Sequence, residues 1–253
     1  MIERTVLEWT YQPTTYFEAP YTNSTSDYTI SVADGTVNVT LVAPQDPVKT
    51  DLLKAVEVQV ETIFASRRMQ THRPCKLEGP STVQYYPNGH RVIAEIAASP
   101  ERTQVRKRRM RVNFVLKDVS GKIVQDTKAE RKAQHARFLD LAVQKSQDAL
   151  LQSLLRSYSA AVDDPANELM HLYEIRDVLA NHFGSKKAAL KRLAIPESQW
   201  QRLGDLANVV PLKQGRHSGR HAGSLRDATQ GELDEARQIV RGWIEKYALS
   251  LPS

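Results

Sequence analysis

A short loop in the last quarter of the chain, residues 208–225, carries the densest group of side chains that could do chemistry. Two arginines and two histidines fall within six residues, preceded by one lysine: Lys213, Arg216, His217, Arg220 and His221. A histidine titrates near neutral pH and can move a proton, and an arginine can donate two parallel hydrogen bonds to a phosphate. The residue types therefore indicate binding of a phosphate or cleavage of a phosphodiester bond.

The spacing of Arg216 and His221 resembles the signature of the HEPN superfamily, small helical bundles found in bacterial toxins and antiviral effectors. In that signature an arginine is followed by a polar residue, here His217, and after four intervening positions by a histidine. The resemblance covers roughly residues 164–250. It implies a metal-independent endoribonuclease that acts as a dimer, with His221 as the acid or base and Arg216 holding the phosphate oxygens. It also implies a bacterial antiviral or toxin-type system.

The glycines of the same loop favour an irregular backbone. Gly215, Gly219 and Gly223 recur every four residues, and each costs about 1 kcal/mol relative to alanine inside a helix. The superfamily places its motif on or at the start of a packed helix. Two other interpretations therefore stay open: a loop that binds an anion or nucleic acid without catalysis, through Lys213, His217 and Arg220, and a solvated basic loop.

A second basic region lies in the middle of the chain. Residues 101–138 hold twelve basic and four acidic side chains, a net charge of +8, whereas residues 1–100 have a net charge of −3. Its densest part contains Arg106, Lys107, Arg108, Arg109 and Arg111. Such a concentration is typical of salt-sensitive binding to nucleic-acid phosphates. A charged edge strand that prevents sheet-to-sheet pairing would have a similar pattern, so this alternative stays open.

Residues 185–203 have the pattern of a helix-turn-helix. An apolar first helix and a short turn precede a second helix with polar positions, and Gly204 is expected to end it. The polar side chains that could reach base edges are Ser198, Gln199, Gln201 and Arg202. Two short helices within a bundle give the same pattern. DNA recognition requires that Gln199 and Arg202 do not pack against the last helix.

The elements that must position these residues change character along the chain. In the first part, apolar and polar residues alternate with a period of two, which predicts strands at 5–11, 28–32, 36–41, 81–86 and 91–97. A helix is expected over 49–66, and a hairpin over 109–116 and 122–126. From about Lys128 the period becomes helical, and helices are expected at 128–163, 165–183, 186–193, 196–203 and 229–248. Thr229 and Glu232 form the pattern of a capping box for the last helix.

These periods predict an α+β protein. We expect a β-rich domain with one or two helices over 1–127, a long connecting helix over 128–163, and an all-α, HEPN-like helical bundle over 164–253. The composition, 41% hydrophobic and 25% charged over 253 residues, is ordinary for a globular protein. No apolar run approaches the roughly 18 residues that span a bilayer. One cysteine, Cys75, and a start without a secretory pattern predict a cytoplasmic protein.

The sequence therefore predicts a protein that engages RNA or another nucleic acid. We expect no metal and no cofactor, because zinc-ligand spacings, Walker loops and dinucleotide fingerprints do not occur. We expect a homo-oligomer or a complex with a partner protein, and no membrane association. The alternatives are a non-catalytic sensor or adaptor that acts as an assembly module, and a helix-turn-helix DNA-binding regulator.

Overall fold

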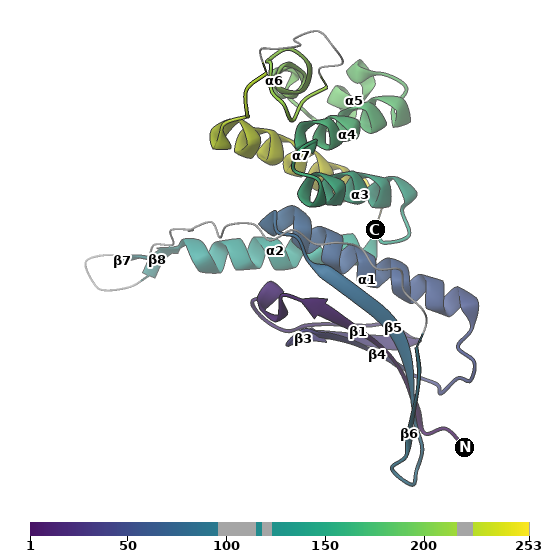
Figure 1. Ribbon diagram of the computed structural model, residues 1–253. Coiled ribbons are helices and arrows are strands. Elements are labelled where there is room, and N and C mark those ends of the chain that lie inside the picture. Colours follow the sequence, from purple (N-terminus) through teal and green to yellow (C-terminus); the bar gives the residue numbers. More distant parts are fainter. Residues whose placement is uncertain (96–114, 118–122, 217–224, 253) are drawn as a thin grey trace. The chain divides into compact units, whose positions relative to one another are not determined.

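The computed structural model of the chain describes residues 1–95, 115–117, 123–216 and 225–252 (Figure 1). The chain forms two compact units. One unit combines Met1–Val60 with Pro74–Arg106, and the other combines Glu61–Arg73 with Lys107–Ser253. The first holds an antiparallel sheet with part of one helix and the second is mostly helical, so the predicted α+β class is confirmed.

The first unit is built on a six-stranded sheet. Its strands are β1 (Arg4–Gln12), β2 (Tyr21–Ser24), β3 (Tyr28–Ala33), β4 (Thr36–Leu41), β5 (Lys76–Tyr85) and β6 (Arg91–Glu95), and a 3-10 turn, η1 (Thr14–Tyr16), follows β1. They lie in the order β2-β3-β4-β1-β5-β6, and every neighbouring pair is antiparallel. Strand β2, which is short and half-exposed, was not predicted from the sequence.

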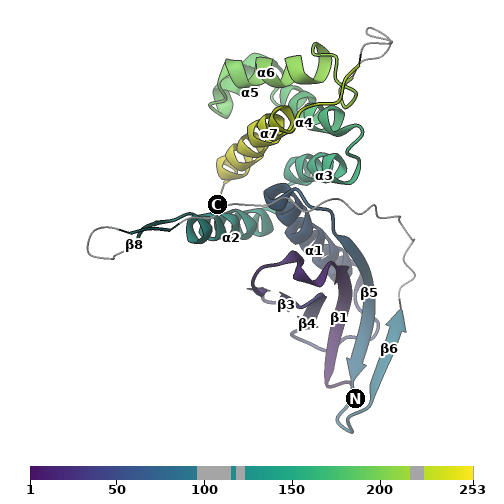
Figure 2. The same ribbon diagram turned by 60° about the vertical axis from the view of Figure 1, so that its left-hand side comes forward.

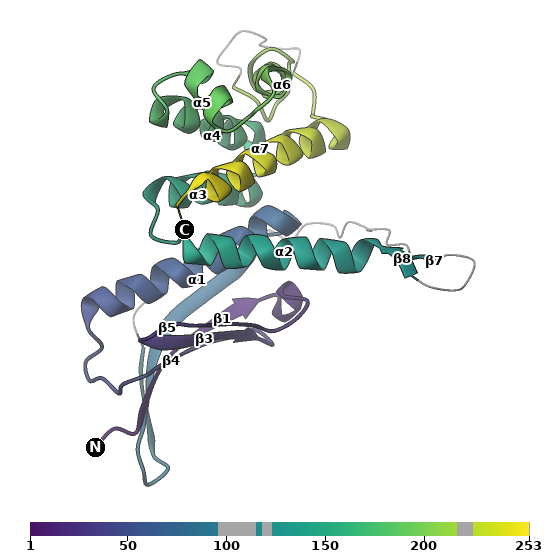
Figure 3. The same cartoon turned by 180° about the vertical axis from the view of Figure 1, so that it is seen from behind.

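The strand register gathers the apolar residues of the sheet on one face. Leu7 pairs with Val39, which pairs with Ile30, and all three side chains are fully buried. On the opposite face Glu8 pairs with Asn38, and polar positions continue along β1. Helix α1 (Thr50–Thr71) follows β4, and its first half lies along the sheet of this unit (Figures 1 and 3). The predicted alternation of buried and exposed positions is thus confirmed.

The second unit contains the rest of α1 and six further helices in its described part. They are α2 (Thr127–Gln144), α3 (Ala149–Asp163), α4 (Glu168–His182), α5 (Lys186–Arg192), α6 (Glu197–Asn208) and α7 (Gln230–Ser250), and a short antiparallel pair, β7 (Val115–Lys117) and β8 (Ile123–Asp126), precedes α2. Helices α4, α6 and α7 pack on one another (Figure 2). Trp200 of α6 stacks on Trp243 of α7 with ring centroids 5.1 Å apart, and both are buried.

Three predicted helix boundaries are wrong. The helix expected over 128–163 is two helices, because the chain turns at 145–148 and the Asp148 side chain accepts a hydrogen bond from the Leu151 N–H, which caps α3. The helix expected from 165 begins at Glu168, after a turn. Gly204 does not end the second helix of the predicted helix-turn-helix; α6 continues to Asn208.

Other local predictions are confirmed. The Thr229 side chain accepts a hydrogen bond from the Glu232 N–H and the Glu232 carboxylate accepts one from the Thr229 N–H, so the capping box of α7 is present. The helix expected over 49–66 exists and continues to Thr71. The strands at 115–117 and 123–126 agree with the expected hairpin, whose other residues lie outside the described part. Throughout the described residues, no helix is both long enough and apolar enough to cross a bilayer.

Candidate functional site

Arg216 lies in the middle of the loop 208–225, which carries the predicted catalytic residues. Its backbone N–H donates a hydrogen bond to the Ala207 carbonyl near the end of α6, at 2.6 Å. Its guanidinium pairs with the Asp177 carboxylate of α4 at 3.2 Å, and its Cζ lies 5.0 Å from the centre of the Tyr173 ring. The predicted partner His221, together with His217 and Arg220, lies outside the described residues, so a joint site of Arg216 and His221 stays a prediction.

Lys213, the other described cation of this loop, is held at the base of the loop. Its ammonium pairs with the Asp227 carboxylate at 3.1 Å, and the Gln214 side chain contacts the same carboxylate at 3.4 Å. The neighbouring Leu212 forms an isolated parallel bridge with Arg226. The two ends of the loop are therefore tied together, and the charge of Lys213 is compensated by Asp227.

A second arginine that could not be singled out from the sequence, Arg176 of α4, contacts the same Tyr173 ring as Arg216. Its Cζ lies 4.7 Å from the centre of the same Tyr173 ring and 5.2 Å from that of Trp200. It donates one hydrogen bond, at 3.4 Å, to the Trp200 carbonyl. Tyr173, Arg176 and Asp177 are spaced three and four apart, so they share one side of α4. Their meeting with Arg216, 39 residues later than Asp177, could not be predicted from the sequence.

The densest part of the central basic region, Arg106, Lys107, Arg108, Arg109 and Arg111, lies outside the described residues. Its continuation is described in α2, whose first half is exposed on most sides. Lys128 and Lys132 are exposed and four residues apart, with the half-exposed Arg131 beside them, and Arg137 is exposed further along. Figures 1 and 3 show this end of α2 extending, with β7 and β8, beyond the other helices of its unit.

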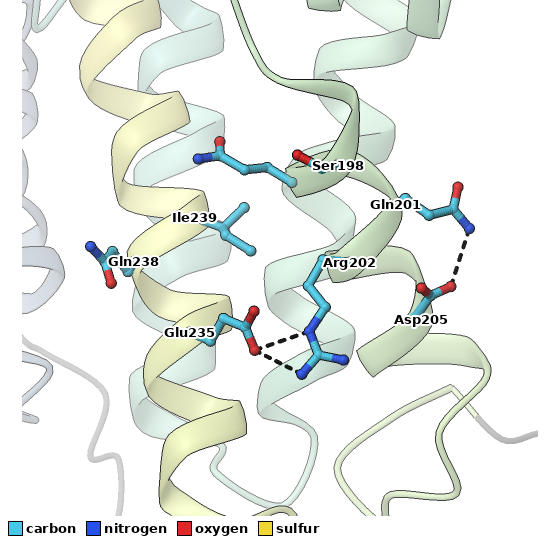
Figure 4. Close-up of a pocket in the computed structure, with 8 residues that line it drawn as sticks. Ser198, Gln201, Arg202, Asp205, Glu235, Gln238 and Ile239 are labelled. Atoms are coloured by element: carbon cyan, nitrogen blue, oxygen red, sulfur yellow. Dashed lines mark hydrogen bonds and ion pairs between the residues drawn. The ribbon is translucent and has the colours of Figure 1, made fainter.

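The two side chains that matter most to the helix-turn-helix hypothesis pack against α7. The Gln199 side-chain oxygen accepts a hydrogen bond from the Trp243 indole N–H at 3.2 Å. The Arg202 guanidinium donates two hydrogen bonds to the Glu235 carboxylate, at 3.0 and 2.8 Å (Figure 4). Both side chains therefore contact the last helix, which the helix-turn-helix hypothesis required them not to do.

An open groove of about 660 Å³ lies between α6 and α7, at the Arg202–Glu235 pair. Ser198, Gln201, Gln238 and Ile239 also line it (Figure 4). Gln201 donates a hydrogen bond to Asp205 at 3.2 Å. The charged groups of the groove thus each have a partner: Arg202 pairs with Glu235, and Asp205 with Gln201.

A buried cluster of charged side chains joins four helices of the second unit. Glu168, the first residue of α4, is fully buried and accepts two hydrogen bonds from the Arg237 guanidinium of α7, the one from Nη2 at 2.6 Å. His72, directly after α1, lies with Nε2 3.4 Å from Glu168 and Nδ1 3.4 Å from the Tyr158 hydroxyl of α3. The Arg241 Nε donates to the same hydroxyl at 2.8 Å. The cluster is compact and densely hydrogen-bonded, which suits a structural role.

The protonation states in this cluster follow from burial and from the neighbouring charges. Burial lowers the pKa of His72, and Arg237 and Arg241 lower it further, against the opposing effect of Glu168. Burial by itself would raise the pKa of Glu168, but its interactions with His72 and Arg237 outweigh burial and hold that pKa below its usual value. The cluster at neutral pH therefore contains a neutral histidine beside a charged Glu168–Arg237 pair.

Comparisons with families of known proteins, with curated proteins and with solved structures find no match to this chain. Within the described ranges, no three His, Cys, Asp or Glu side chains are grouped so that they could hold a metal ion. Two of the candidate sites have exposed or half-exposed cations that could contact a phosphate: the first half of α2, and Arg176 with Arg216.

Proposed function

We propose that this protein binds nucleic acid, and RNA in the first place, through the basic region 101–138. The observation that carries the proposal is the exposure of Lys128, Lys132 and Arg137 along α2, which continues this +8 region. Cations spread along an exposed helix can contact successive phosphates and release their counterions. The single cysteine, Cys75, is in keeping with a reducing compartment, and we place the binding in the cytosol.

Binding is tested by the salt dependence of RNA affinity. The double variant Lys128→Glu with Lys132→Glu should weaken binding of a fluorescent single-stranded RNA by at least about tenfold, and lower the slope of log affinity against log salt by about two. The measurement is fluorescence anisotropy between low and physiological salt. Replacing Arg106, Arg108 and Arg109 by Glu should act in the same direction.

The chain offers a matched control on α5. Lys187 and Lys191 are also exposed and four residues apart on a helix. Their reversal to Glu changes the net charge of the protein by the same amount as the α2 variant. Equal losses in the two double variants would mean that RNA responds to the total charge of the protein, and would end the proposal of a site on α2.

The resemblance at Arg216 and His221 adds metal-independent cleavage of the bound RNA, by a dimer, as a candidate activity. In support, the Arg216 side chain is 45% exposed, and a second arginine, Arg176, contacts the same Tyr173 ring. The test is RNA cleavage in EDTA by the wild type and by His221→Ala. Cleavage lost in the variant supports catalysis at His221, and equal cleavage in both contradicts it. RNA that is bound and left intact would instead indicate the non-catalytic sensor or adaptor.

A further inference from the structure

The guanidinium of Arg176 is held in place without an acidic partner among the described residues. It lies against the rings of Tyr173 and Trp200 and donates one hydrogen bond to the Trp200 carbonyl. An arginine can donate five hydrogen bonds, so most of its donors have no partner in the described part of the protein. Aromatic contacts keep the group oriented while these donors stay available.

A glycine in α6 provides the space for this guanidinium. The backbone of Gly204 has ordinary helical geometry, so its conformation does not require glycine. A Cβ at this position would collide with Nη1 of Arg176, and its next nearest neighbour, Cζ of the same arginine, would lie 3.4 Å away. Glycine costs about 1 kcal/mol relative to alanine inside a helix. Glycine at 204 thus leaves open the space that the Arg176 guanidinium occupies.

The second arginine of this site has one acidic partner, and the pair is exposed. Arg216 and Asp177 lie 3.2 Å apart, with their side chains 45% and 48% exposed. Exposed ion pairs contribute little free energy, because water solvates the separated charges well. An incoming anion can therefore displace Asp177 from Arg216. With Arg176, Arg216 and Asp177 together, the site has a net charge of +1.

We propose that Arg176 and Arg216 bind a phosphate group beside Tyr173, and that Asp177 occupies Arg216 until the phosphate arrives. Two guanidiniums can donate paired hydrogen bonds to the oxygens of one phosphate. The phosphate belongs either to the backbone of a nucleic acid or to the end of a nucleotide. This site is separate from α2, so it can exist whether or not the basic region binds RNA.

The test is a titration of the full ¹⁵N-labelled chain, followed by NMR at the arginine Nε–H signals. The probes are adenosine 5′-monophosphate, adenosine, and an RNA tetranucleotide with a 5′-hydroxyl end. Shifts of the Arg176 and Arg216 signals with the monophosphate and not with adenosine support a terminal phosphate. Shifts with the tetranucleotide support a backbone phosphate. No shift with either phosphate-bearing probe overturns the proposal.

Variants decide whether the arginines act as a built site. Arg176→Gln should weaken binding about tenfold, and Arg176→Lys should not restore it, because an ammonium lacks the planar fork. Asp177→Asn should strengthen binding by several-fold. Arg202→Gln, which removes a comparably exposed guanidinium from the same unit, should leave the affinity unchanged. Equal losses in Arg176→Gln and Arg202→Gln would overturn the proposal.

Gly204→Ala separates binding from folding. Alanine favours the helix, so a thermal melt of this variant should show a transition at or above that of the wild type. Its methyl group should displace the Arg176 guanidinium and weaken phosphate binding about as much as the loss of Arg176. The Arg176 NMR signal should move in this variant. If it moves and phosphate still binds with wild-type affinity, binding does not depend on the position of Arg176.

Discussion

Arg237 and Arg176 lie in the same helical unit and have opposite environments. The Arg237 side chain is 4% exposed, and its donors are taken by Glu168 and Asp234. Arg176 is half-exposed, has no acidic partner among the described residues, and is oriented by two aromatic rings. A buried guanidinium must be satisfied within the protein, because an unpaired charge in the interior is very costly. An exposed one can leave its donors to water, and hence to a ligand.

The two environments predict different consequences for the loss of each arginine. Four elements supply polar side chains to the Arg237 cluster, and its hydrogen bonds connect α1, α3, α4 and α7. The loss of Arg237 should therefore lower the stability of the folded protein. The Arg176 site connects α4 to the loop after α6 through aromatic contacts and one exposed ion pair. Its removal should be seen in binding, with a small effect on folding.

The largest expected effect is on the buried pair. Arg237→Ala should lower the free energy of unfolding by about 3–5 kcal/mol, because Glu168 is left charged and buried without its main partner. Urea denaturation followed by circular dichroism measures this loss. The double variant Arg237→Met with Glu168→Met, which removes both charges, should recover at least half of it. If Arg237→Ala lowers the free energy of unfolding by less than about 1 kcal/mol, the distinction drawn between Arg237 and Arg176 is wrong.

The second effect is a loss of stability in mild acid. Since the pKa of His72 is lowered in the folded protein, the unfolded chain binds the proton more tightly. The free energy of unfolding should therefore be highest above the ordinary histidine pKa of about 6.5 and should fall as the pH drops below it. The fall is about 1.4 kcal/mol for each tenfold difference in proton affinity between the unfolded and the folded state.

Urea denaturation measures this dependence at about pH 7.5 and about pH 5.5, which lie above and below the ordinary histidine pKa of about 6.5. His72→Asn removes the titrating group and keeps a residue type that tolerates the left-handed backbone at this position, where φ is 48°. The variant should lose less stability than the wild type between the two pH values. An identical pH dependence in both proteins would contradict a buried, neutral His72.

The smallest effect is expected at the exposed pair of the α6–α7 groove. A double-mutant cycle on Arg202→Ala and Glu235→Ala should give a coupling free energy below about 1 kcal/mol, which salt reduces. The two side chains are 40% and 44% exposed, so water screens their attraction. A coupling as large as that between Arg237 and Glu168 would show that exposure does not separate the two classes of arginine in this protein.

Most of the fold could be predicted from periodicity. The Asp34-Gly35 turn between β3 and β4 and the capping box at Thr229 are local signals that need no distant partner. The break between α2 and α3 could not be predicted, because the apolar stripe continues across it and Asp148, a common residue type, provides the cap. Gly204 was misinterpreted as a helix end, because its real neighbour, Arg176, lies 28 residues earlier in the chain.

The candidate sites could be predicted less well. The sequence indicates Arg216 through its unusual neighbours, and the structure adds Tyr173, Arg176 and Asp177, whose approach depends on how α4 and α6 pack. The buried cluster was missed because His72 appears isolated in the sequence and Glu168 and Arg237 are 69 residues apart. Charges that meet through tertiary packing have no signature in a single sequence.

Helix α1 passes from one unit to the other between Val60 and Glu61, and the chain returns to the first unit at Pro74. The two units are therefore not successive segments, and no single cleavage of the chain yields both of them whole. A fragment that begins after β6 would contain all of α2 to α7 and would lack residues 61–73. It would thus lose His72, and Glu168 would keep Arg237 without the imidazole that lies beside it in the whole protein. The sheet-bearing half of the sequence therefore supplies part of the interior of the helical half.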